Sequence, residues 1–386
     1  MSKILVVPDL PLERWPSMDR YASRLVQHLD AEAATFEIAV AGEIASLTNE
    51  KVKQPGRRAS GPRSRRLADE GGSTELRRYL ARYWLYPRRI RAMDGAAVHV
   101  LDHSYAHIVT GERKRPCVVT VHDLFPVITL RRSPGGVRDH VRNWLLTRVV
   151  NGIRQADRWI VATEWLREQL CEWLGHYDRV HVIPYGVDEA FLGAPQDDRA
   201  LCRARWEIPE SAFVILHVGS VDTRKNVPAI IAVLDQLRSE GMEAWFLQVG
   251  GSLTADQQTD LSSRGVAEYV TELGPVAEVE LRNAYHASDM LLFPSHYEGF
   301  GFPVLEAMAS GLPVVTSGAG GLTEVAGDAA VIVPVRESKP YVEAIKQIAD
   351  DAEWREDLAR RGRERAALFT WSQAATDTAK VYETLV

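Results

Sequence analysis

The chain has 386 residues, of which 46% are hydrophobic and 25% are charged, as is usual for a soluble globular protein. A chain of this length predicts two domains. The longest uncharged segment, 307–323, is interrupted by glycines and a proline, which excludes a membrane-spanning helix there.

The three cysteines, Cys117, Cys171 and Cys202, lack the spacing of a metal site. The N-terminus leads directly into a strand, without the pattern of a signal peptide. An odd number of cysteines in such a chain indicates a reducing cytoplasm.

Charge is distributed unevenly along the chain. Residues 1–190 include 29 basic and 23 acidic residues, whereas residues 191–386 include 17 and 29. A basic first half suits an anionic lipid surface or a phosphorylated substrate. Segment 51–66 has seven basic residues and no acidic one. It is either a solvated loop without a role or a contact with an anionic membrane or a phosphate; a nucleic acid partner is not expected, because no aromatic platform accompanies it.

Strands and helices alternate in the first half, with strands predicted at 3–8, 36–41, 96–102, 117–123, 159–162 and 181–187. This alternation predicts a parallel sheet with right-handed crossovers. The loop after the first strand, 9–16, includes Arg14 and Trp15, and Ser17 begins the helix that follows.

Two later helices of the first half combine basic and aromatic residues. Helix 75–93 has six arginines around Trp84, which suits a helix on a membrane surface. An ordinary amphipathic helix with Trp84 in the core is the alternative, and Pro87 is expected to kink or split the helix. In helix 139–156 the apolar spacing predicts four inward residues: Val141, Trp144, Leu145 and Val149.

Histidines cluster near the ends of two of these strands. His103 and His107 have the spacing of a helix face, but no acidic residue completes a metal motif, so we expect core histidines. Strand 117–123 ends in His122 and Asp123. The carboxyl end of a parallel strand is where ligands bind, which makes His122 a candidate site residue.

A linker at 188–198 precedes the second half, which has six further strands. The first of them, 213–219, leads into a loop, 220–226, that starts with Ser220 and contains Arg224 and Lys225. Because a helix follows at once, fixed positive charge and unpaired amides coincide in this loop. The loop therefore predicts a phosphate site.

Segment 289–334 is the most informative part of the sequence. A buried strand, 290–294, is followed by a glycine turn, Glu298-Gly299-Phe300-Gly301, and by a helix that runs from Pro303 to Ala309. The glycines leave room for a ligand to approach the backbone, and the helix start suits phosphate or sugar oxygens.

Glu298 and Glu306 flank this turn. A carboxylate accepts two hydrogen bonds, which matches the diol of a sugar or of a ribose. Glu306 could instead be a solvated helix residue, but its neighbours Val304, Leu305 and Ala307 are apolar, and a buried glutamate needs a partner.

Two glutamates separated by seven residues, with Phe-Gly after the first and EAMASGLPVV around the second, resemble the signature of the family-4 retaining glycosyltransferases. That family has the GT-B fold, an α/β architecture of two Rossmann-like domains facing a cleft, with a C-terminal helix that returns to the first domain. The resemblance implies an acceptor domain at 1–190 with returning helix 371–386, and a nucleotide-sugar domain at 191–370.

The resemblance also implies roles for individual residues on the donor side. Glu298 would lie by the transferred sugar, Glu306 would hold the ribose, and the amides of Gly299, Phe300 and Gly301 would face the sugar. Lys225 would neutralise the donor diphosphate, with Arg224 as the adjacent alternative and Ser220 in the same loop. The segment Gly274-Pro275-Val276 resembles the loop that holds the base through its backbone.

On the acceptor side, VTVHDLFP resembles the strand whose histidine approaches the transferred sugar, so His122 would contact donor sugar or acceptor; a structural hydrogen bond is the alternative. Arg14, Trp15 and Ser17 are acceptor-side candidates. Ser17 stands where the family usually has glycine, and Tyr185 stands where it more often has asparagine.

The implied reaction is sugar transfer from a nucleotide-diphosphate sugar to a hydroxyl, with retention of configuration. No Asp-x-Asp motif occurs, so we expect neither a metal nor a cofactor. The flanks resemble polysaccharide mannosyltransferases, which favours GDP-mannose as donor. The acceptor would be a glycan, a lipid-linked sugar or a small molecule, in the cytoplasm or at the inner face of the membrane. An epimerase of the same fold and a non-catalytic nucleotide-sugar binding protein are the alternatives.

Overall fold

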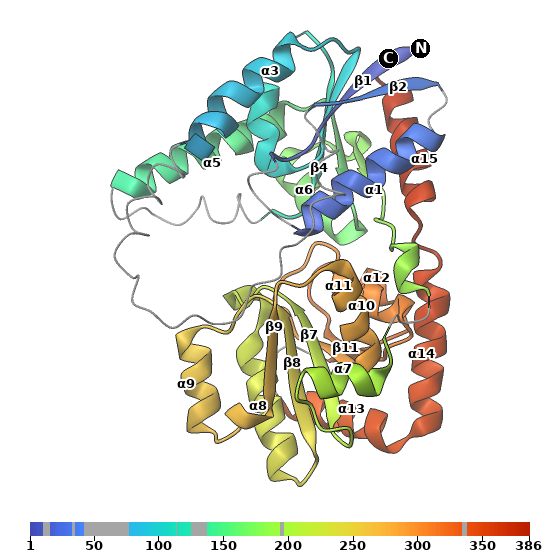
Figure 1. Cartoon of the computed structure of the whole chain (residues 1–386). Coiled ribbons are helices and arrows are strands. Elements are labelled where there is room, and N and C mark those ends of the chain that lie inside the picture. The colour runs from blue at the N-terminus through green and yellow to red at the C-terminus, as the bar shows by residue number, and fades with distance from the viewer. Residues whose placement is uncertain are drawn as a thin grey trace. The chain divides into compact units, whose positions relative to one another are not determined.

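The computed structural model describes residues 1–10, 16–32, 35–41, 77–112, 114–124, 137–193, 197–333 and 338–386 (Figure 1). Arg14, Trp15 and the basic segment 51–66 lie outside these residues. The chain divides into two compact units. Unit 1 comprises Met1–Ala162, Arg167–Pro184 and Trp371–Val386, and unit 2 comprises Thr163–Leu166 and Tyr185–Thr370.

Unit 1 is built on a sheet of six parallel strands in the order β2-β1-β3-β4-β5-β6. The strands are β1 (Ser2–Val7), β2 (Phe36–Val40), β3 (Ala97–Val100), β4 (Cys117–Val121), β5 (Arg158–Val161) and β6 (Val180–Val182). All six match the predicted strands. Strand β1 pairs with β2 on one side and with β3 on the other, so the strand order reverses between β1 and β3.

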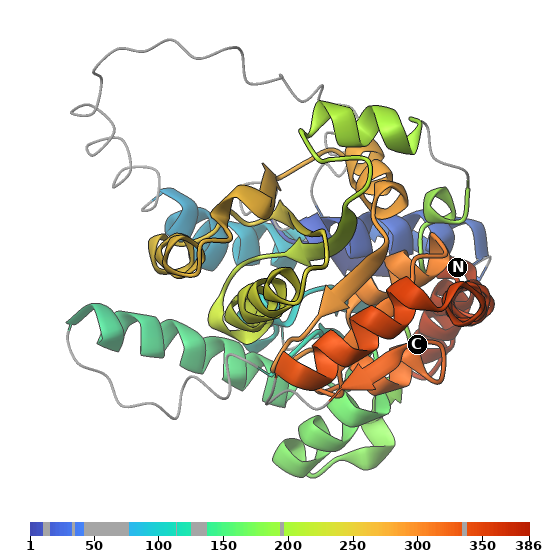
Figure 2. The same cartoon turned by 90° about the horizontal axis from the view of Figure 1, so that it is seen from below.

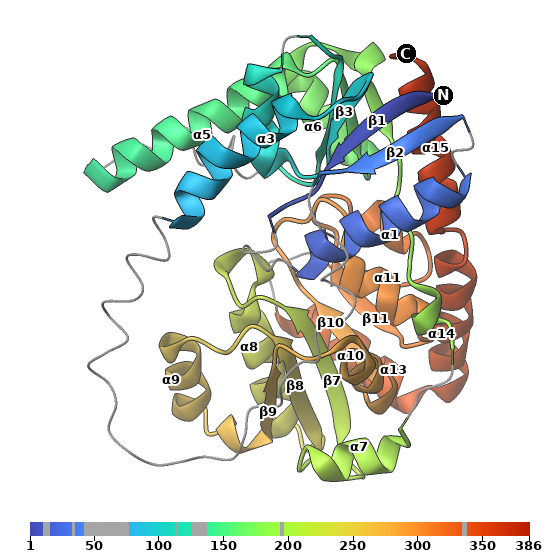
Figure 3. The same cartoon turned by 45° about the horizontal axis from the view of Figure 1, so that its top comes forward.

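The helical segments of unit 1 are α1 (Pro16–Glu32), the π-helix η2 (Ala81–Leu85), α3 (Tyr86–Ala92), the 3-10 helix η3 (His103–Gly111), α5 (Val137–Gln155), α6 (Glu164–Leu174, whose first residues belong to unit 2), η4 (Tyr177–Arg179) and α15 (Trp371–Glu383). Figure 3 shows α1 lying alongside α15. Pro87 lies in the first turn of α3, where its missing N–H is tolerated, and the helix changes there from π to α geometry.

Helix α15 belongs to unit 1 although it ends the chain. The Tyr382 hydroxyl lies 2.7 Å from Nδ1 of the buried His99, and the Tyr382 ring packs edge-on against Phe36. The predicted return of the last helix to the first sheet is confirmed.

The prediction for α5 was wrong for two of its four residues. Val141 and Trp144 are 54% and 56% exposed, whereas Val149 is buried. The helix packs on η3 around Gly152, where an added Cβ would lie 1.8 Å from the Ala106 carbonyl oxygen. Burial is therefore confined to the second half of the helix. Trp84 is also outside the core, with 55% of its surface exposed.

Unit 2 has a second sheet of six parallel strands, in the order β12-β11-β10-β7-β8-β9. The strands are β7 (Phe213–Gly219), β8 (Ala244–Gly250), β9 (Val270–Gly274), β10 (Met290–Phe293), β11 (Val314–Ser317) and β12 (Val331–Val333). The chain runs outward from β7 to β9 and then returns to β10 on the other side of β7. This order makes the gap between β7 and β10 the topological switch point of the sheet.

The helical segments of unit 2 lie on both faces of its sheet (Figure 2). They are η5 (Glu189–Phe191), α7 (Arg199–Arg205), η6 (Thr223–Lys225), α8 (Val227–Ser239), α9 (Ala255–Ser263), η7 (Ala267–Tyr269), α10 (Glu278–Ala287), α11 (Phe302–Ala309), α12 (Leu322–Ala326), α13 (Ser338–Asp350) and α14 (Ala352–Ala366). The predicted α/β architecture with two Rossmann-like sheets is confirmed.

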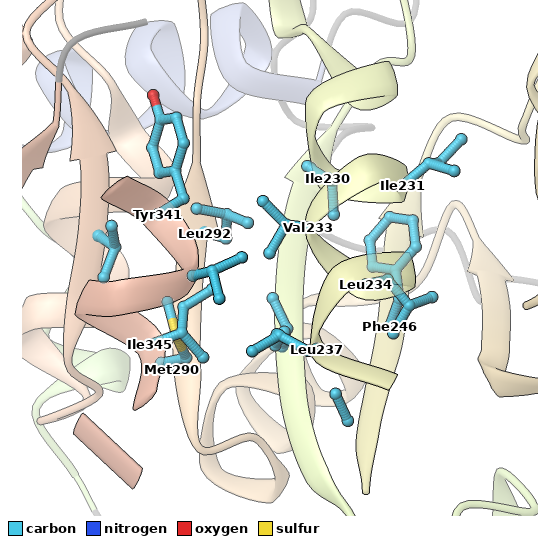
Figure 4. Packing of buried hydrophobic residues seen from close by; sticks show 14 of the residues in the cluster. Ile230, Ile231, Val233, Leu234, Leu237, Phe246, Met290, Leu292, Tyr341 and Ile345 are labelled. Atoms are coloured by element: carbon cyan, nitrogen blue, oxygen red, sulfur yellow. The ribbon is translucent and has the colours of Figure 1, made fainter. Parts of the chain in front are cut away.

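The main core of unit 2 lies between α8, α13 and the sheet (Figure 4). Ile230, Leu234 and Leu237 recur at helical spacing along α8 and are fully buried. Ile345 on α13 and Met290 on β10 belong to the same cluster. Burying one such side chain stabilises the fold by about 1.5–3 kcal/mol, so this core holds the strand ends in fixed positions.

Two further findings concern the described part of the chain only. No helix in it is both long enough and apolar enough to cross a membrane. Cys117, Cys171 and Cys202 are all buried.

Candidate active site

The strongest candidate site lies at the topological switch point of unit 2. Strands β7 and β10 are neighbours in the sheet although two strands separate them in the sequence. The loop after β7 carries Arg224 and Lys225, and the loop after β10 carries Glu298. Because the strands are parallel, both loops leave the sheet at the same edge, where α/β proteins bind ligands.

A buried ion pair joins the two loops. Nζ of Lys225 lies 2.7 Å from Oε1 of Glu298, and each side chain is only 8% exposed. Arg224 adds a second positive charge, with its Nη1 3.6 Å from Oε2 of Glu298. Removing two charges from water costs several kcal/mol for each ion, so a pair of this kind needs further partners or a functional reason to be retained.

Local hydrogen bonds fix the loop that carries Lys225. The Asp222 carboxylate accepts from the Arg224 backbone N–H and caps the short helix η6. The Arg224 carbonyl accepts from the His296 N–H, which ties this loop to the one after β10. Ser220 is exposed and donates its hydroxyl proton to Asp222 at 2.6 Å. Ser220 thus shapes the loop.

The glycine turn after β10 presents backbone rather than side chains. Phe300 is buried, and its ring packs against Tyr185 and Phe302, so only its backbone is available to a ligand. Gly301 has a φ of +100° and precedes α11. A Cβ there would lie 2.5 Å from Cδ2 of Leu322, so no other residue fits without rearrangement. Tyr185, whose effect the sequence left open, belongs to this aromatic cluster.

Glu306 is buried in α11, as its apolar neighbours predicted. Its partner is Tyr285 on α10, whose hydroxyl donates to Oε2 of Glu306 at 2.7 Å. A buried carboxylate that accepts such a bond keeps a defined orientation. Tyr285 was not predicted as a site residue; its place in a helix just before a buried strand indicates only a buried position.

A second glycine segment, 318–321, supports the turn and was also missed. The Gly321 N–H donates to the Glu298 carbonyl at 2.9 Å. At Gly320, with a φ of +64°, a Cβ would lie 2.2 Å from that same carbonyl oxygen. The signal in the sequence was a run of small residues directly after strand β11.

The predicted base-binding segment lies further along the same edge. Gly274 ends β9, and Pro275 and Val276 follow it. In the sheet, β8 separates β9 from β7. A ligand that reaches from Glu298, after β10, to this segment has to extend past the ends of β7 and β8, as a nucleotide sugar can.

In unit 1, His122 lies at the carboxyl end of β4 and is buried. Its Nε2 lies 2.8 Å from the Leu101 carbonyl, so this nitrogen carries the proton and donates. Burial lowers the pKa of His122 to about 4, which keeps the ring neutral near pH 7. This hydrogen bond agrees with the structural alternative for His122, and the contact of His122 with donor sugar or acceptor stays a prediction.

Two carboxyl groups face each other where the strand order of unit 1 reverses. Asp9 follows β1 and Asp102 follows β3, and each has a buried oxygen, Oδ1 of Asp9 and Oδ2 of Asp102, that accepts no hydrogen bond from any other described residue outside this pair. Burial, the charge of Asp102 and a hydrogen bond between the carboxyls raise the pKa of Asp9 well above 3.8. Burial alone would raise the pKa of Asp102, but His103 and His122 outweigh it and lower that pKa. At a pH between the two pKa values, the pair therefore holds one proton, which lies on Asp9.

This arrangement predicts how Asp9→Asn changes stability with pH. The folded chain binds the Asp9 proton more tightly than the unfolded chain. The stabilisation that follows is complete below pH 3.8, the ordinary pKa of the group, and is lost as the pH rises through the pKa of Asp9 in the folded chain. The side-chain amide of asparagine does not titrate, so its N–H donates to Asp102 at every pH in this range. We therefore expect the melting temperature of Asp9→Asn, relative to the parent chain, to increase between pH 5 and pH 8 in thermal denaturation. A difference that stays constant or decreases would contradict proton sharing.

Metal binding has no support in the described ranges, since no group of three or more His, Cys, Asp or Glu residues there is arranged to hold a metal ion. The independence from metal and cofactors therefore stays a prediction. Ser17, the remaining acceptor-side candidate, is exposed in the first turn of α1.

Solved structures of other proteins share the fold of this chain. HepE (Alr3699) from Anabaena, solved with UDP and glucose, aligns over 100% of both chains with a TM-score of 0.74 and 17% identity. Sucrose-phosphate synthase from Thermosynechococcus elongatus aligns over 100% of this chain and 99% of its own, with a TM-score of 0.70 and 22% identity. These likenesses show the GT-B fold.

Two family models match successive parts of the chain. The model "Glycosyltransferase Family 4" matches residues 18–191, and "Glycosyl transferases group 1" matches residues 198–365. The chain belongs to the family-4 glycosyltransferases with the GT-B fold.

Curated relatives cover part of the chain. A D-inositol 3-phosphate glycosyltransferase from Kineococcus radiotolerans is 34% identical over 255 residues, which is 61% of this chain and 58% of the relative. O-antigen chain mannosyltransferase B from Escherichia coli is 34% identical over 173 residues, 44% of this chain and 45% of the relative. The match thus spans about half the length of these relatives.

Proposed function

We propose that this chain transfers a sugar from a nucleotide-diphosphate sugar to a hydroxyl group. The observation that carries the proposal is the buried pair of Lys225 and Glu298 at the switch point of unit 2, beside the glycine turn and the start of α11. A cation and a carboxylate beside a glycine turn and the start of a helix suit a diphosphate and a sugar at once. Unit 2 binds the donor, and unit 1 contributes acceptor-binding residues.

In this reaction the bond between sugar and diphosphate breaks, and negative charge develops on the leaving phosphate. Lys225 and Arg224 stabilise that charge, and Glu298 lies beside the sugar, where positive charge develops. The acceptor hydroxyl attacks from the side of the leaving group, which retains configuration. No metal takes part, because the two basic residues supply the positive charge at the diphosphate.

GDP-mannose is the donor we favour, supported by the motif flanks and by the mannosyltransferase relative. The acceptor is a glycan, a lipid-linked sugar or a small molecule. A thermal-shift panel of nucleoside diphosphates tests the donor base, since a ligand at about 100 times its Kd adds about 2.7 kcal/mol. The largest shift should come from GDP; a larger shift with UDP would exclude the guanine donor.

Product analysis separates the alternatives. A glycosyltransferase makes a new glycoside only when an acceptor is present, whereas an epimerase releases free sugar and nucleotide without one. Binding of the nucleotide sugar without either product would indicate a non-catalytic binding protein. The presence of both glutamates with Lys225 favours turnover.

We further propose that unit 1 binds an anionic membrane surface through η2, α3 and the first half of α5. Residues 77–92 include six arginines and no acidic residue. Trp84 and Trp144 are exposed, and the guanidinium of Arg88 lies 3.4 Å from the Trp84 ring centre. Exposed tryptophans beside arginines suit the boundary between headgroups and acyl chains.

Vesicle cosedimentation tests this surface. Trp84→Ala combined with Trp144→Ala should weaken binding to phosphatidylserine-containing vesicles at least about tenfold, because each buried aromatic side chain contributes a few kcal/mol. Tyr177→Ala, which removes an aromatic side chain that is 57% exposed elsewhere in unit 1, is the control and should not change binding. Equal binding of the double variant and the parent chain would exclude this surface.

A further inference from the structure

The hydrogen bond between Tyr285 and Glu306 joins two helices of unit 2. Tyr285 extends from α10, the helix before β10, and Glu306 lies in α11, the helix after it. The Tyr285 side chain is fully buried, and its ring packs edge-on against Phe191 at 5.7 Å. Packing therefore fixes the position of the ring independently of the hydrogen bond that its hydroxyl makes.

The tyrosine has one proton to donate and two acceptors within reach. Oε2 of Glu306 is 2.7 Å from its hydroxyl, whereas the Pro303 carbonyl oxygen is 3.5 Å away. The shorter distance shows that the Tyr285 hydroxyl donates its hydrogen bond to the carboxylate rather than to the carbonyl. Since a hydrogen bond to a carboxylate is stronger than one between neutral groups, this contact holds the Glu306 side chain in one orientation.

We infer that Tyr285 is a positioning residue, which orients the carboxylate of Glu306 so that it accepts the ribose hydroxyls of the donor nucleotide. A carboxylate has about four lone-pair positions, so the bond to Tyr285 leaves capacity for a diol. The inference rests on the proposed function, in which Glu306 holds the ribose. The inference adds Tyr285, which lies on α10 and outside the loops at the strand ends, to the donor-binding site.

Tyr285→Phe removes the donor and keeps the ring. Without the hydrogen bond from Tyr285 the Glu306 carboxylate can turn away. A ribose hydroxyl should then contribute less to the affinity for the nucleotide, while contacts with base and diphosphate persist. The experiment measures, by titration calorimetry, the Kd of UDP and GDP and of their 2′-deoxy and 3′-deoxy counterparts. We expect the parent chain to prefer at least one ribonucleotide over its deoxy counterpart by about tenfold or more, and Tyr285→Phe to reduce that ratio at least fivefold.

Two further variants make the result specific. Tyr341→Phe is the matched control, because Tyr341 is equally buried in unit 2 and its hydroxyl makes no hydrogen bond to the described residues. It should leave the ratio unchanged. In a Glu306→Gln background, Tyr285→Phe should have little additional effect on the ratio, since the residue that it orients is already altered.

The outcomes separate this inference from the proposed function. A parent chain that binds ribonucleotide and deoxynucleotide equally would overturn the role of Glu306 itself. A parent chain that discriminates, with a ratio unchanged in Tyr285→Phe, would overturn the positioning role alone. A variant that loses affinity for both nucleotides to the same extent would show that Tyr285 only supports the fold.

Discussion

Glu298→Gln should lower kcat/KM for sugar transfer by about 10²–10³-fold, which corresponds to about 3–4 kcal/mol of transition-state stabilisation. Glutamine keeps the shape of the side chain and still accepts a hydrogen bond from Lys225, which lies 2.7 Å away. What it removes is the negative charge beside the sugar, where positive charge develops in the transition state. Steady-state kinetics with a labelled nucleotide sugar measures the change.

Glu356→Gln provides the control for Glu298→Gln. It makes the same chemical change at an exposed position of α14 in the same unit. The control should keep the activity of the parent chain, and both variants should melt as single folded species. Product formation by Glu298→Gln at the parent rate would show that Glu298 has no part in the reaction.

Lys225→Met should weaken the binding of a nucleoside diphosphate by about 10–100-fold, while binding of the nucleoside alone stays the same. A charge-assisted hydrogen bond to phosphate contributes about 1.5–3 kcal/mol, and each 1.4 kcal/mol is about tenfold in Kd. Methionine keeps most of the length of the lysine side chain. Titration calorimetry with UDP, GDP, uridine and guanosine separates the phosphate contribution from that of the base.

The loss of Lys225 also affects stability, because Glu298 would remain buried with only Arg224, 3.6 Å away, as a positive partner. Breaking a buried ion pair costs about 3–5 kcal/mol, so a lower melting temperature is expected. Lys339→Met is the control, since Lys339 is 75% exposed and makes only a 3.9 Å surface pair with Glu343. Equal loss of affinity for nucleoside and nucleoside diphosphate would argue against a phosphate contact.

The fold could be predicted closely because strands and helices alternate and because glycine and proline residues mark many of their ends. The six strands of unit 2 end at, or directly before, a glycine or a proline of the sequence, and the glycine turn and Pro303 located α11 within one residue. The two sheets could be inferred from this order, because parallel strands require crossover connections. The returning helix α15 followed from the family resemblance, since helical periodicity alone names no partner.

The environment of side chains was harder to infer. Helix α5 has apolar residues at helical spacing along its whole length, yet only the part around Gly152 packs on η3, so Val141 and Trp144 are exposed. Periodicity shows which residues share a face but not how much of that face is covered.

Pairings between distant residues were also beyond the sequence. The sequence indicated that Lys225 and Glu298 lie at the same sheet edge, because both follow parallel strands, but it did not indicate the ion pair between them. The bond of Tyr285 to Glu306 and the facing carboxyls of Asp9 and Asp102 depend on side-chain direction and on strand order. Neither can be read from residue spacing.

A crystal structure of the chain with bound GDP or UDP tests the central claim most directly. We expect the diphosphate within about 3 Å of Lys225 Nζ and the ribose hydroxyls on the Glu306 carboxylate, at the carboxyl ends of β7 and β10. A nucleotide bound elsewhere, with the 2.7 Å contact between Lys225 and Glu298 unchanged and no ligand near Glu306, would contradict it.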